Sequence, residues 1–357
     1  MTNDLTATMR EAFAGALGDG RPSTWRDAFA AVPREIFVPT FHRQDERGRW
    51  HQVTEADEGF LNAVYSDSAL MTQLDERGIP TSSSSEPCLM LTMLDALDAR
   101  IGDNVFELGA GTGYNAALLS HRLGSENVTS VDVDDTLVKA ARERLHSAGY
   151  DPFLFAGDGT QGRLDRAPYA RIIATAALTS IPPALVRQAD RGGVIVAPIG
   201  LGIVRTTVSG PGHAEGDFLP PPALFMPQRT TGGQPAFDAL PDRDPETSEV
   251  PVADVLNRLR FPLSLALPGY QSCSWRDGHG ALTGVGLWTD DGSTASASAT
   301  GAVRQTGPRR LWDTVEGLVA LFPEGQPARE EFRLTVAPHE QRVRHEPSGA
   351  SWALPLG

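Results

Sequence analysis

Short apolar runs alternate with amphipathic segments through the middle of the chain. The apolar runs end in glycine or acidic residues, and the segments between them carry apolar residues at helical spacing. The predicted strands are 104–111, 127–134, 153–159, 169–177 and 192–200, and the predicted helices are 86–99, 114–124, 136–149 and 181–189. Because such alternation favours a parallel sheet covered by helices on both faces, the pattern predicts an α/β domain.

The N-terminal part of the chain has a different pattern. Apolar residues at helical spacing predict helices within residues 1–35, whereas residues 40–75 are polar and are predicted to be irregular. Three aromatic residues in the polar stretch, Trp50, Phe60 and Tyr65, are candidate packing anchors. Because residues 40–80 directly precede a run of serines, we expect them to form part of the wall that faces the substrate, within an N-terminal helical or lid segment over 1–80.

The pattern changes again after residue 202. Residues 203–219 predict a hairpin, and a stretch rich in proline, glycine and acidic residues predicts a linker or loop. Short β-like runs follow, among them 261–267, and they surround one predicted helix at 311–322. The predicted division is an N-terminal segment over 1–80, an α/β domain over 81–225, a linker over 226–251 and a small α+β module over 252–357.

Composition narrows the class of protein. The 357 residues carry a formal net charge of −14, which opposes general binding to nucleic acid, although acidity also simply keeps proteins soluble. No apolar run approaches the roughly 20 residues of a membrane span, and no secretory signal is evident at the N-terminus. Two distant cysteines and eight histidines without ligand spacing predict a cytoplasmic protein with no metal site.

The run TSSSSEPC occupies residues 81–88, just before a predicted helix. Ser85 followed by Pro87 is a common helix start, so Ser85 can be interpreted as an N-cap. The hydroxyls can equally be interpreted as the lining of a reaction site, and the two interpretations do not exclude each other. A covalent nucleophile at Ser85 is disfavoured, because no GxSxG elbow surrounds it.

The segment VFELGAGTGYNAA, residues 105–117, carries the strongest chemical signal. A strand delivers Glu107, and Gly109, Gly111 and Gly113 then alternate before a helix, so that bare main chain can lie against a ligand. The spacing is GxGxG, not the GxGxxG of nicotinamide enzymes, whose helix N-terminus receives a pyrophosphate. An acid at Glu107 would repel a pyrophosphate, but it suits the cationic amino group of S-adenosylmethionine (SAM).

The ends of the later strands extend this signal. Asp132 ends the second strand, where a carboxylate can accept hydrogen bonds from both ribose hydroxyls. Asp158 and Gly159 follow the third strand, where they can meet the adenine edge. Because these features occur in the right order, the sequence predicts SAM as the cofactor and S-adenosylhomocysteine as its product.

Several motifs together resemble one family. VPREIFVP at 32–39, the Ser85-Glu86-Pro87 element, the glycine loop, SVDVD, AGDG, APYARIIATAA and GGVIVAPIG stand in the order seen in protein-L-isoaspartate O-methyltransferases. The resemblance implies a Rossmann-like class I SAM-dependent methyltransferase fold and places Ser85 at the active site beside the cofactor. Further positions that it matches to the site are Ser82, Ser83, Ser84, Thr112, Asp132, Val133, Asp158 and Gly159.

Two departures point to a particular branch. Cys88, interpreted as a small packed residue, stands where the repair enzymes usually have histidine, and those enzymes lack the long C-terminal extension. The combination of TSSSSEP, YSDSALMTQL, APYARIIATAA, FMPQR (225–229) and the long tail resembles a branch that matures ribosomally made peptides beside ATP-grasp ligases that close ester or amide rings (graspetides). A sister branch acts on lanthipeptides. This implies a peptide substrate whose methylated aspartate collapses to an aspartimide, and an ATP-grasp ligase acting upstream.

The predicted mechanism follows from the charge of the methyl acceptor, an aspartate side chain. An aspartate with a pKa near ~3.9 is already ionised at neutral pH, so the site needs alignment rather than a strong base. We expect Ser85 to donate a hydrogen bond to the non-attacking oxygen, with Ser84 as a second catalytic candidate and with Ser84, Thr81 and Tyr65 facing the peptide. The alternatives are a general isoaspartyl repair enzyme and a cofactor sensor or peptide chaperone without turnover. The C-terminal module could recognise the peptide, form a dimer interface or brace the first domain.

Overall fold

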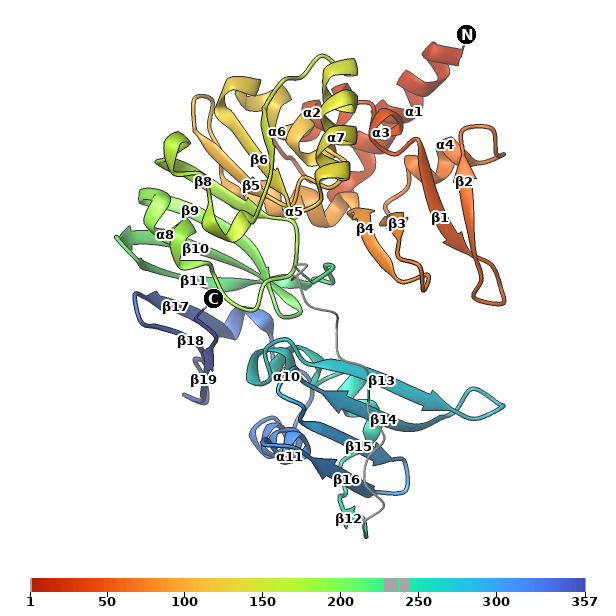
Figure 1. The fold of residues 1–357 in the computed structure, drawn as a ribbon, viewed down its shortest axis with the longest axis vertical. Helices are drawn as coiled ribbons and strands as arrows, with labels where there is room; N and C mark the ends of the chain where they lie inside the picture. Colours follow the sequence, from red (N-terminus) through yellow and green to blue (C-terminus); the bar gives the residue numbers. More distant parts are fainter. Residues whose placement is uncertain (1, 228–236, 238–243, 357) are drawn as a thin grey trace.

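A ten-stranded sheet runs through the computed structural model, which describes residues 2–227, 237 and 244–356 (Figure 1). The strand order is β19-β18-β17-β11-β10-β9-β8-β5-β6-β7. Its parallel part consists of β5 (Val105–Leu108), β6 (Val128–Asp132), β7 (Phe153–Ala156), β8 (Tyr169–Ala174) and β9 (Ala189–Ile199). Every residue of β5 and β6 is buried, which explains why these strands read as continuous apolar runs.

Helices cover this parallel part, as predicted. They are α5 (Pro87–Leu97), α6 (Tyr114–Leu123), α7 (Asp135–Ser147) and α8 (Pro183–Gln188). The side chain of Asp134 caps α7 by accepting hydrogen bonds from the backbone N–H groups of Thr136 and Leu137. The predicted α/β class is therefore confirmed, with β-to-α connections that gather at one edge of the sheet.

The N-terminal segment is only partly helical. Its helices are α1 (Thr2–Ala16), α2 (Arg26–Ala31), α3 (Arg34–Phe37) and α4 (Phe60–Val64). The prediction that 40–75 is irregular is wrong, because a four-stranded sheet in the order β2-β1-β3-β4 occupies this region. Its strands are β1 (Thr40–Gln44), β2 (Trp50–Thr54), β3 (Leu70–Leu74) and β4 (Pro80–Ser84).

Two identical turns explain how this polar segment forms a sheet. Each hairpin closes through the sequence Asp-Glu-Arg-Gly, at 45–48 and again at 75–78. Asp45 and Asp75 each accept two backbone N–H hydrogen bonds across their own turn, at 2.8–2.9 Å. Gly48 and Gly78 supply the positive φ of 74° and 77° that these turns require. The turns, rather than hydrophobic alternation, set the register.

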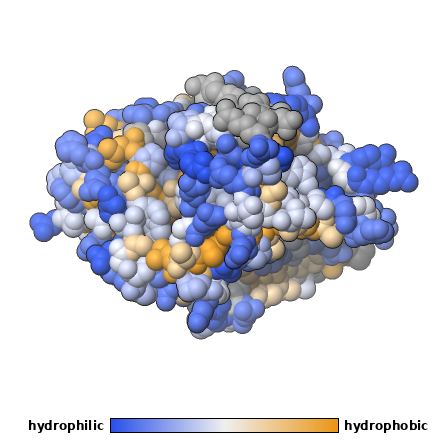
Figure 2. All heavy atoms as spheres, turned by 90° about the horizontal axis from the view of Figure 1, so that it is seen from below, coloured by the Kyte–Doolittle hydropathy of each residue, from blue (hydrophilic) through white to orange (hydrophobic). Residues whose placement is uncertain are grey.

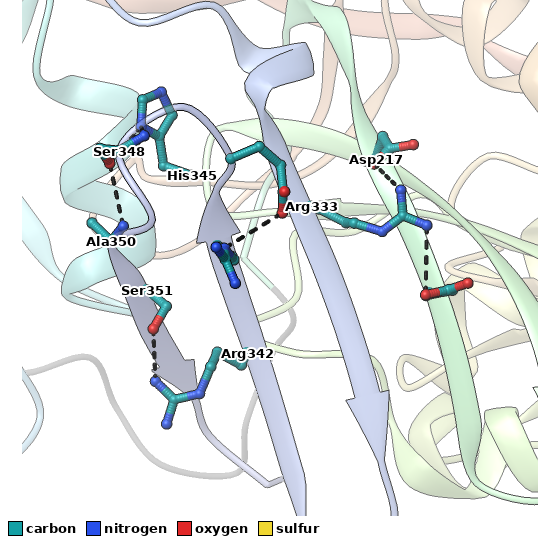
Figure 3. A network of polar contacts seen from close by, with 10 residues as sticks. Asp217, Arg333, Arg342, His345, Ser348, Ala350 and Ser351 are labelled. Carbon is teal, nitrogen blue, oxygen red and sulfur yellow. Dashed lines mark hydrogen bonds and ion pairs between the residues drawn. The ribbon is translucent and has the colours of Figure 1, made fainter.

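The end of the chain completes the central sheet. β10 (Gly202–Gly210) and β11 (His213–Pro222) form the predicted hairpin, and β11 pairs with β17 (Phe332–Ala337). β18 (Glu340–His345) and β19 (Ser351–Leu354) follow in antiparallel order. Figure 3 shows Arg333 of β17 reaching to Asp217 of β11 at 3.1 Å. The predicted boundary at 252 therefore does not separate the α/β sheet from all that follows it.

A smaller body lies between these strands in sequence. It contains a five-stranded antiparallel sheet of β12 (Glu246–Thr247), β13 (Gln271–Arg276), β14 (Leu282–Trp288), β15 (Thr294–Ser298) and β16 (Ala302–Thr306). Its helices are α9 (Val252–Leu256), α10 (Arg260–Ala266) and α11 (Leu311–Leu321). We call the segment 244–331 the C-terminal module. Part of the predicted linker at 226–251 lies outside the described residues.

The strand prediction for 261–267 is wrong. These residues form most of α10, and Phe261 to Leu265 are all buried, so no amphipathic period marks the helix. The underside of the molecule shows hydrophilic residues around smaller apolar patches (Figure 2). Within the described part of the chain, no helix is both long enough and apolar enough to cross a membrane.

Candidate active site

A cavity of about 1320 Å³ opens at the carboxyl ends of β5, β6 and β7, the edge where ligands bind in open parallel sheets. Three parts of the chain line it. The α/β domain contributes Leu108–Thr112, Tyr114, Asn115, Val131–Val133, Asp158, Gly159, Thr175 and Ala176. The serine run contributes Pro80–Glu86 together with Cys88, and the far wall comes from Leu201, Pro221–Pro227 and the C-terminal module.

Gly109 lets the glycine loop turn closely over the end of β8. Its φ is +101°, and a Cβ there would lie 2.5 Å from the Thr175 hydroxyl. That hydroxyl donates a 2.6 Å hydrogen bond to the Gly109 carbonyl, while the N–H groups of Gly109 and Ala110 donate to the Val131 carbonyl. The loop is thus held from both sides and leaves no room for a side chain at Gly109.

The rest of the loop leads into α6. Gly113 is the N-cap of this helix, with a φ of +88°, and a Cβ there would lie 3.2 Å from the Ala141 side chain on α7. The Thr112 hydroxyl accepts a hydrogen bond from the Tyr114 N–H at 3.3 Å. Thr112 lines the cavity, whereas Gly113 serves the close packing of the two helices.

Asp132 joins the loop to β6. One carboxylate oxygen accepts a hydrogen bond from the Gly111 N–H at 2.9 Å, and the other accepts one from the Asp134 N–H at 3.1 Å. These two bonds hold the carboxylate at the edge of the cavity that Asp132 lines. The neighbouring Val133 side chain is 49% exposed and lines the same cavity, which gives an apolar surface beside the carboxylate.

Asp158 and Gly159 close this end of the cavity. Burial disfavours ionisation of Asp158, but hydrogen bonds from Thr160 and Gln161 outweigh it and lower the pKa of the carboxyl group. The Thr160 hydroxyl and N–H donate to one of its oxygens at 2.7 and 2.9 Å. A Cβ at Gly159 would lie 2.7 Å from Leu108, so only glycine fits there.

Glu107 does not lie in the cavity, where its predicted contact with the cofactor would place it. The side chain is fully buried and does not line the cavity. Its two carboxylate oxygens accept hydrogen bonds from the side chains of Ser130 and Asn115, which hold it in this buried position. Asn115 does line the cavity, and its Oδ1 is buried with no hydrogen-bond partner in the described part of the chain. Glu107 orients Asn115 by accepting a hydrogen bond from its Nδ2. The Asn115 Oδ1 then remains as an acceptor for a hydrogen bond from a bound molecule.

The buried acid makes stability depend on pH. Burial raises the pKa of Glu107 from 4.5 to about 7, so between these values the folded chain binds the proton that the unfolded chain has lost. Stability therefore falls as pH rises through this window. In the parent, the free energy of unfolding should fall by on the order of 3 kcal/mol between about pH 4 and pH 8. We expect Glu107→Gln to remove this fall, as measured by urea titrations at several pH values. The exposed control Glu143→Gln should decline like the parent; an unchanged decline in Glu107→Gln would contradict this assignment.

The serine run forms a strand before it reaches the helix. Residues Pro80–Ser84 are β4, and Glu86 is the N-cap of α5 without a side-chain hydrogen bond. The interpretation of Ser85 as a capping residue is therefore wrong. Ser85 and Ser83 line the cavity, and in the part of the chain that the structure describes neither hydroxyl has a hydrogen-bond partner. These two hydroxyls remain available to a bound molecule.

Ser82 and Ser84 are held more tightly. Both are buried and line the cavity, and the Ser82 hydroxyl accepts a 3.3 Å hydrogen bond from Thr72. A Cβ at Gly111 would lie 3.9 Å from that hydroxyl and 3.8 Å from the Ser83 carbonyl, so the serine run lies directly against the glycine loop. The structure thus brings together the two motifs that sequence analysis treated separately.

Arg34, from the VPREIFVP motif, fixes the end of the serine run. Its side chain is fully buried, and burial lowers the pKa of its guanidinium group. Its acceptors are the carbonyl oxygens of Val64, Ser66, Ser68, Ser84 and Ser85 and the Ser84 hydroxyl, at 2.8–3.5 Å. One side chain therefore ties the chain before Ser85 to the segment that follows α4.

Three other predicted residues are placed as follows. Tyr65 does not line the cavity: its hydroxyl donates to Glu35 and its ring packs on Phe13 at 5.5 Å, so its predicted contact with the peptide is wrong. Thr81 does line it and donates to the Gln73 side chain at 2.8 Å. Burial raises the pKa of the Cys88 thiol to about 11, as suits the predicted packing role.

Sequence analysis missed Asn115, Thr175, Arg34 and Arg260, all but Arg34 in the cavity lining. Arg329, which also lines the cavity, is one of seven C-terminal arginines that from sequence could either meet an acidic peptide or form solvated surface. Arg34 had a signal, since it stands inside a quoted motif, but its buried position is a tertiary feature. Thr175 stands in the quoted ATAA segment. The arginines of the module lie far from every motif, and no local pattern marks them.

The fold and the glycine loop at the edge of its sheet define a class I SAM-dependent methyltransferase. The family profile for protein-L-isoaspartate(D-aspartate) O-methyltransferase matches residues 21–209, more than half of the chain. The chain therefore belongs to the protein-L-isoaspartate O-methyltransferase family, whose members are carboxyl methyltransferases.

Curated relatives carry the same description. A protein-L-isoaspartate O-methyltransferase of Ignicoccus hospitalis is 33% identical over 175 residues, which are 48% of this chain and 72% of that protein. One of Methanococcus maripaludis is 41% identical over 177 residues, 49% of this chain and 72% of that protein. Each alignment covers about half of this chain.

A solved structure described as a protein-L-isoaspartate O-methyltransferase extends further. It is 21% identical, aligns with 94% of this chain and 96% of that chain, and has a TM-score of 0.54, which shows a shared fold. An alignment of this extent includes the C-terminal module and β17–β19. The fold of the extension is therefore shared with this solved structure.

Proposed function

We propose that the chain transfers the methyl group of SAM to the side-chain carboxylate of an aspartyl or isoaspartyl residue in a peptide. The observation that carries this proposal is one cavity that joins the glycine loop, Asp132 and the unpartnered hydroxyls of Ser83 and Ser85. Bound SAM supplies a methyl group activated by its sulfonium. No further activating group is needed on the acceptor, because an aspartyl carboxylate is ionised at neutral pH.

The lining of the cavity fits SAM on three counts. The Asn115 Oδ1 is a buried acceptor without a partner in the described residues, and it suits the ammonium of the amino-acid end. The Asp132 carboxylate suits the ribose hydroxyls, and Val133 gives an apolar face for the adenine. Gly109, Gly111, Thr112 and Gly159 shape the main chain around these groups, and we assign Ser82 and Ser83 to the same half of the cavity.

We assign the acceptor half to Ser85 and Ser84. Ser85 donates a hydrogen bond to the non-attacking oxygen and so points the other oxygen at the methyl group. Ser84, whose hydroxyl accepts from Arg34 at 3.2 Å, keeps its own hydrogen for a second donor bond. Thr81 extends this wall toward the peptide. Positioning of this kind lowers the barrier by orientation rather than by proton transfer.

Ser85→Ala is expected to reduce kcat/KM about 10- to 100-fold, because a hydrogen bond to a charged group contributes about 1.5–3 kcal/mol. SAM affinity, measured by calorimetry, should change far less. Ser147→Ala, at the end of α7 and outside the cavity, is the control and should behave like the parent. Unreduced methylation by Ser85→Ala would remove Ser85 from the acceptor half.

As the particular substrate we propose a ring-closed, ribosomally made peptide of the graspetide class, with an ATP-grasp ligase acting upstream in the cytoplasm. The size of the cavity supports this, since about 1320 Å³ exceeds the roughly 300–1,000 Å³ of small-molecule sites. After methylation, the amide nitrogen of the next residue attacks the ester carbonyl, the nitrogen loses its proton and methanol departs. The product is an aspartimide, which hydrolysis can open to isoaspartate.

General repair of isoaspartyl proteins is the second candidate, and the described activity of the relatives favours it. Mass spectrometry after incubation with SAM separates the two. A graspetide enzyme should methylate a ring-closed peptide and leave a linear isoaspartyl peptide nearly untouched. Rapid turnover of the linear peptide would favour repair, and a lanthipeptide added as a third substrate tests the sister branch.

A further inference from the structure

Two arginines of the C-terminal module line the same cavity as Ser85 and the glycine loop. Arg260 begins α10, and Arg329 begins the short helical turn before β17. Two amide side chains of the module, Asn257 and Gln326, line the cavity near them in sequence. Four donor side chains of one module, beside the apolar Leu256 and Phe261, therefore line the cavity that also contains the reaction hydroxyls.

Arg329 packs against a rigid base. The Arg329 guanidinium lies 5.0 Å from the centre of the Phe261 ring, the residue next to Arg260. Phe261 is buried and packs on Phe218 of β11 and Phe332 of β17 at 5.3 and 5.1 Å. Because both strands belong to the central sheet, Arg329 is held in a set place relative to the α/β domain, whereas the side chain of Arg260 is exposed at the start of α10.

Neither arginine forms a salt bridge with any residue that the structure describes, and the Nε of Arg329 is buried without a hydrogen-bond partner there. Three other arginines of the module, Arg258, Arg309 and Arg310, form salt bridges with acidic residues. Arg258 contacts Asp254 at 2.7 Å, and Arg309 contacts Asp291 at 2.6 Å. In a chain with a net charge of −14, two cations left without acidic partners on one cavity wall indicate that their partner is a bound anion.

We propose that Arg260 and Arg329 form a subsite for a second carboxylate of the substrate peptide, one that is not methylated. This inference rests on the proposed function and assigns the C-terminal module a role in substrate selection. Guanidinium groups bind carboxylates through paired hydrogen bonds. Such a site also offsets the repulsion that an acidic protein exerts on an acidic peptide.

The test uses the full-length enzyme and peptides with one target residue. A single Glu is moved along the peptide, and each Glu peptide is compared with its Gln counterpart through kcat/KM. At one or more positions we expect the parent enzyme to prefer Glu by at least about tenfold, as for a hydrogen-bonded charge. Arg260→Gln and Arg329→Gln should each bring this ratio close to one, because kcat/KM for the Glu peptide falls to near that of its Gln counterpart.

Arg276→Gln is the matched control, because Arg276 belongs to the same module but does not line the cavity. It should keep the full preference for Glu. Arg260 is exposed, so its variant tests the inference even if Arg329→Gln impairs folding. If the parent turned over the peptides without preferring Glu, or if Arg260→Gln kept the preference, the inference would be overturned and the proposed function would stand. If the enzyme bound SAM but methylated no peptide, both the inference and the proposed function would be overturned.

Discussion

Replacement of Gly109 by alanine is expected to reduce the affinity for SAM at least about 30-fold, which corresponds to about 2 kcal/mol. The added Cβ would lie 2.5 Å from the Thr175 hydroxyl, at a φ of +101°. The loop must move away from β8 to relieve this contact, and it then loses the hydrogen bond from Thr175 to the Gly109 carbonyl. Calorimetric titration with SAM measures the effect.

Gly149→Ala separates the steric contact from backbone strain. Gly149 also has a positive φ, +83°, but a Cβ there would meet nothing within 4 Å. This control should lose only the roughly 1–2 kcal/mol of stability that a left-handed residue costs, with SAM affinity unchanged. Equal loss of SAM binding in both variants, or in neither, would contradict the role of the close approach at Gly109.

Replacement of Arg34 by methionine is expected to destabilise the chain by at least about 3 kcal/mol and to remove most of the methylation activity. Methionine fills much of the space but leaves buried carbonyl oxygens without donors, each at a cost of about 1–3 kcal/mol. The Ser85 carbonyl is among them, so the reaction hydroxyls lose their fixed position. Urea titration gives the stability, and kcat/KM below the melting range gives the activity.

Arg34→Lys sharpens this prediction. Lysine keeps the charge, but its single ammonium offers three donors where the guanidinium offers five, so we expect it to restore only part of the stability. Arg43→Met is the control on the exposed face of β1, and it should change stability by less than about 0.5 kcal/mol. If Arg34→Met matched Arg43→Met in both measurements, Arg34 would not position the serine run.

The parallel core could be predicted because its signals are local. Buried strands such as Val105–Leu108 are continuous apolar runs, and Gly109 and Gly113 mark where they turn into helices. The N-terminal sheet was missed because its strands are short and polar, and its only sequence signal is the repeated Asp-Glu-Arg-Gly turn. A search for turn motifs, rather than for hydrophobic period, would have found it.

Other features depend on contacts between distant segments. The pairing of β17 with β11 joins residues more than a hundred positions apart, which no local pattern specifies. The sequence likewise shows an acid, Glu107, just before the glycine loop, but it does not show where the side chain points. Its hydrogen-bond partners, Ser130 of β6 and Asn115 of α6, hold it away from the cavity. The serine run stands out in the sequence, but Arg34, the residue whose hydrogen bonds hold Ser84 and Ser85, lies about fifty positions away.

The account depends most on methyl transfer from SAM to a carboxylate oxygen, and one assay tests this directly. The purified chain is incubated with SAM labelled in its methyl group and with isoaspartyl and ring-closed aspartyl peptides, and the products are then treated with mild base. We predict label on at least one peptide, released by base as methanol, because a methyl ester is labile where an N-methyl group is not. Absence of label on every peptide, or label that survives the base, would contradict the account.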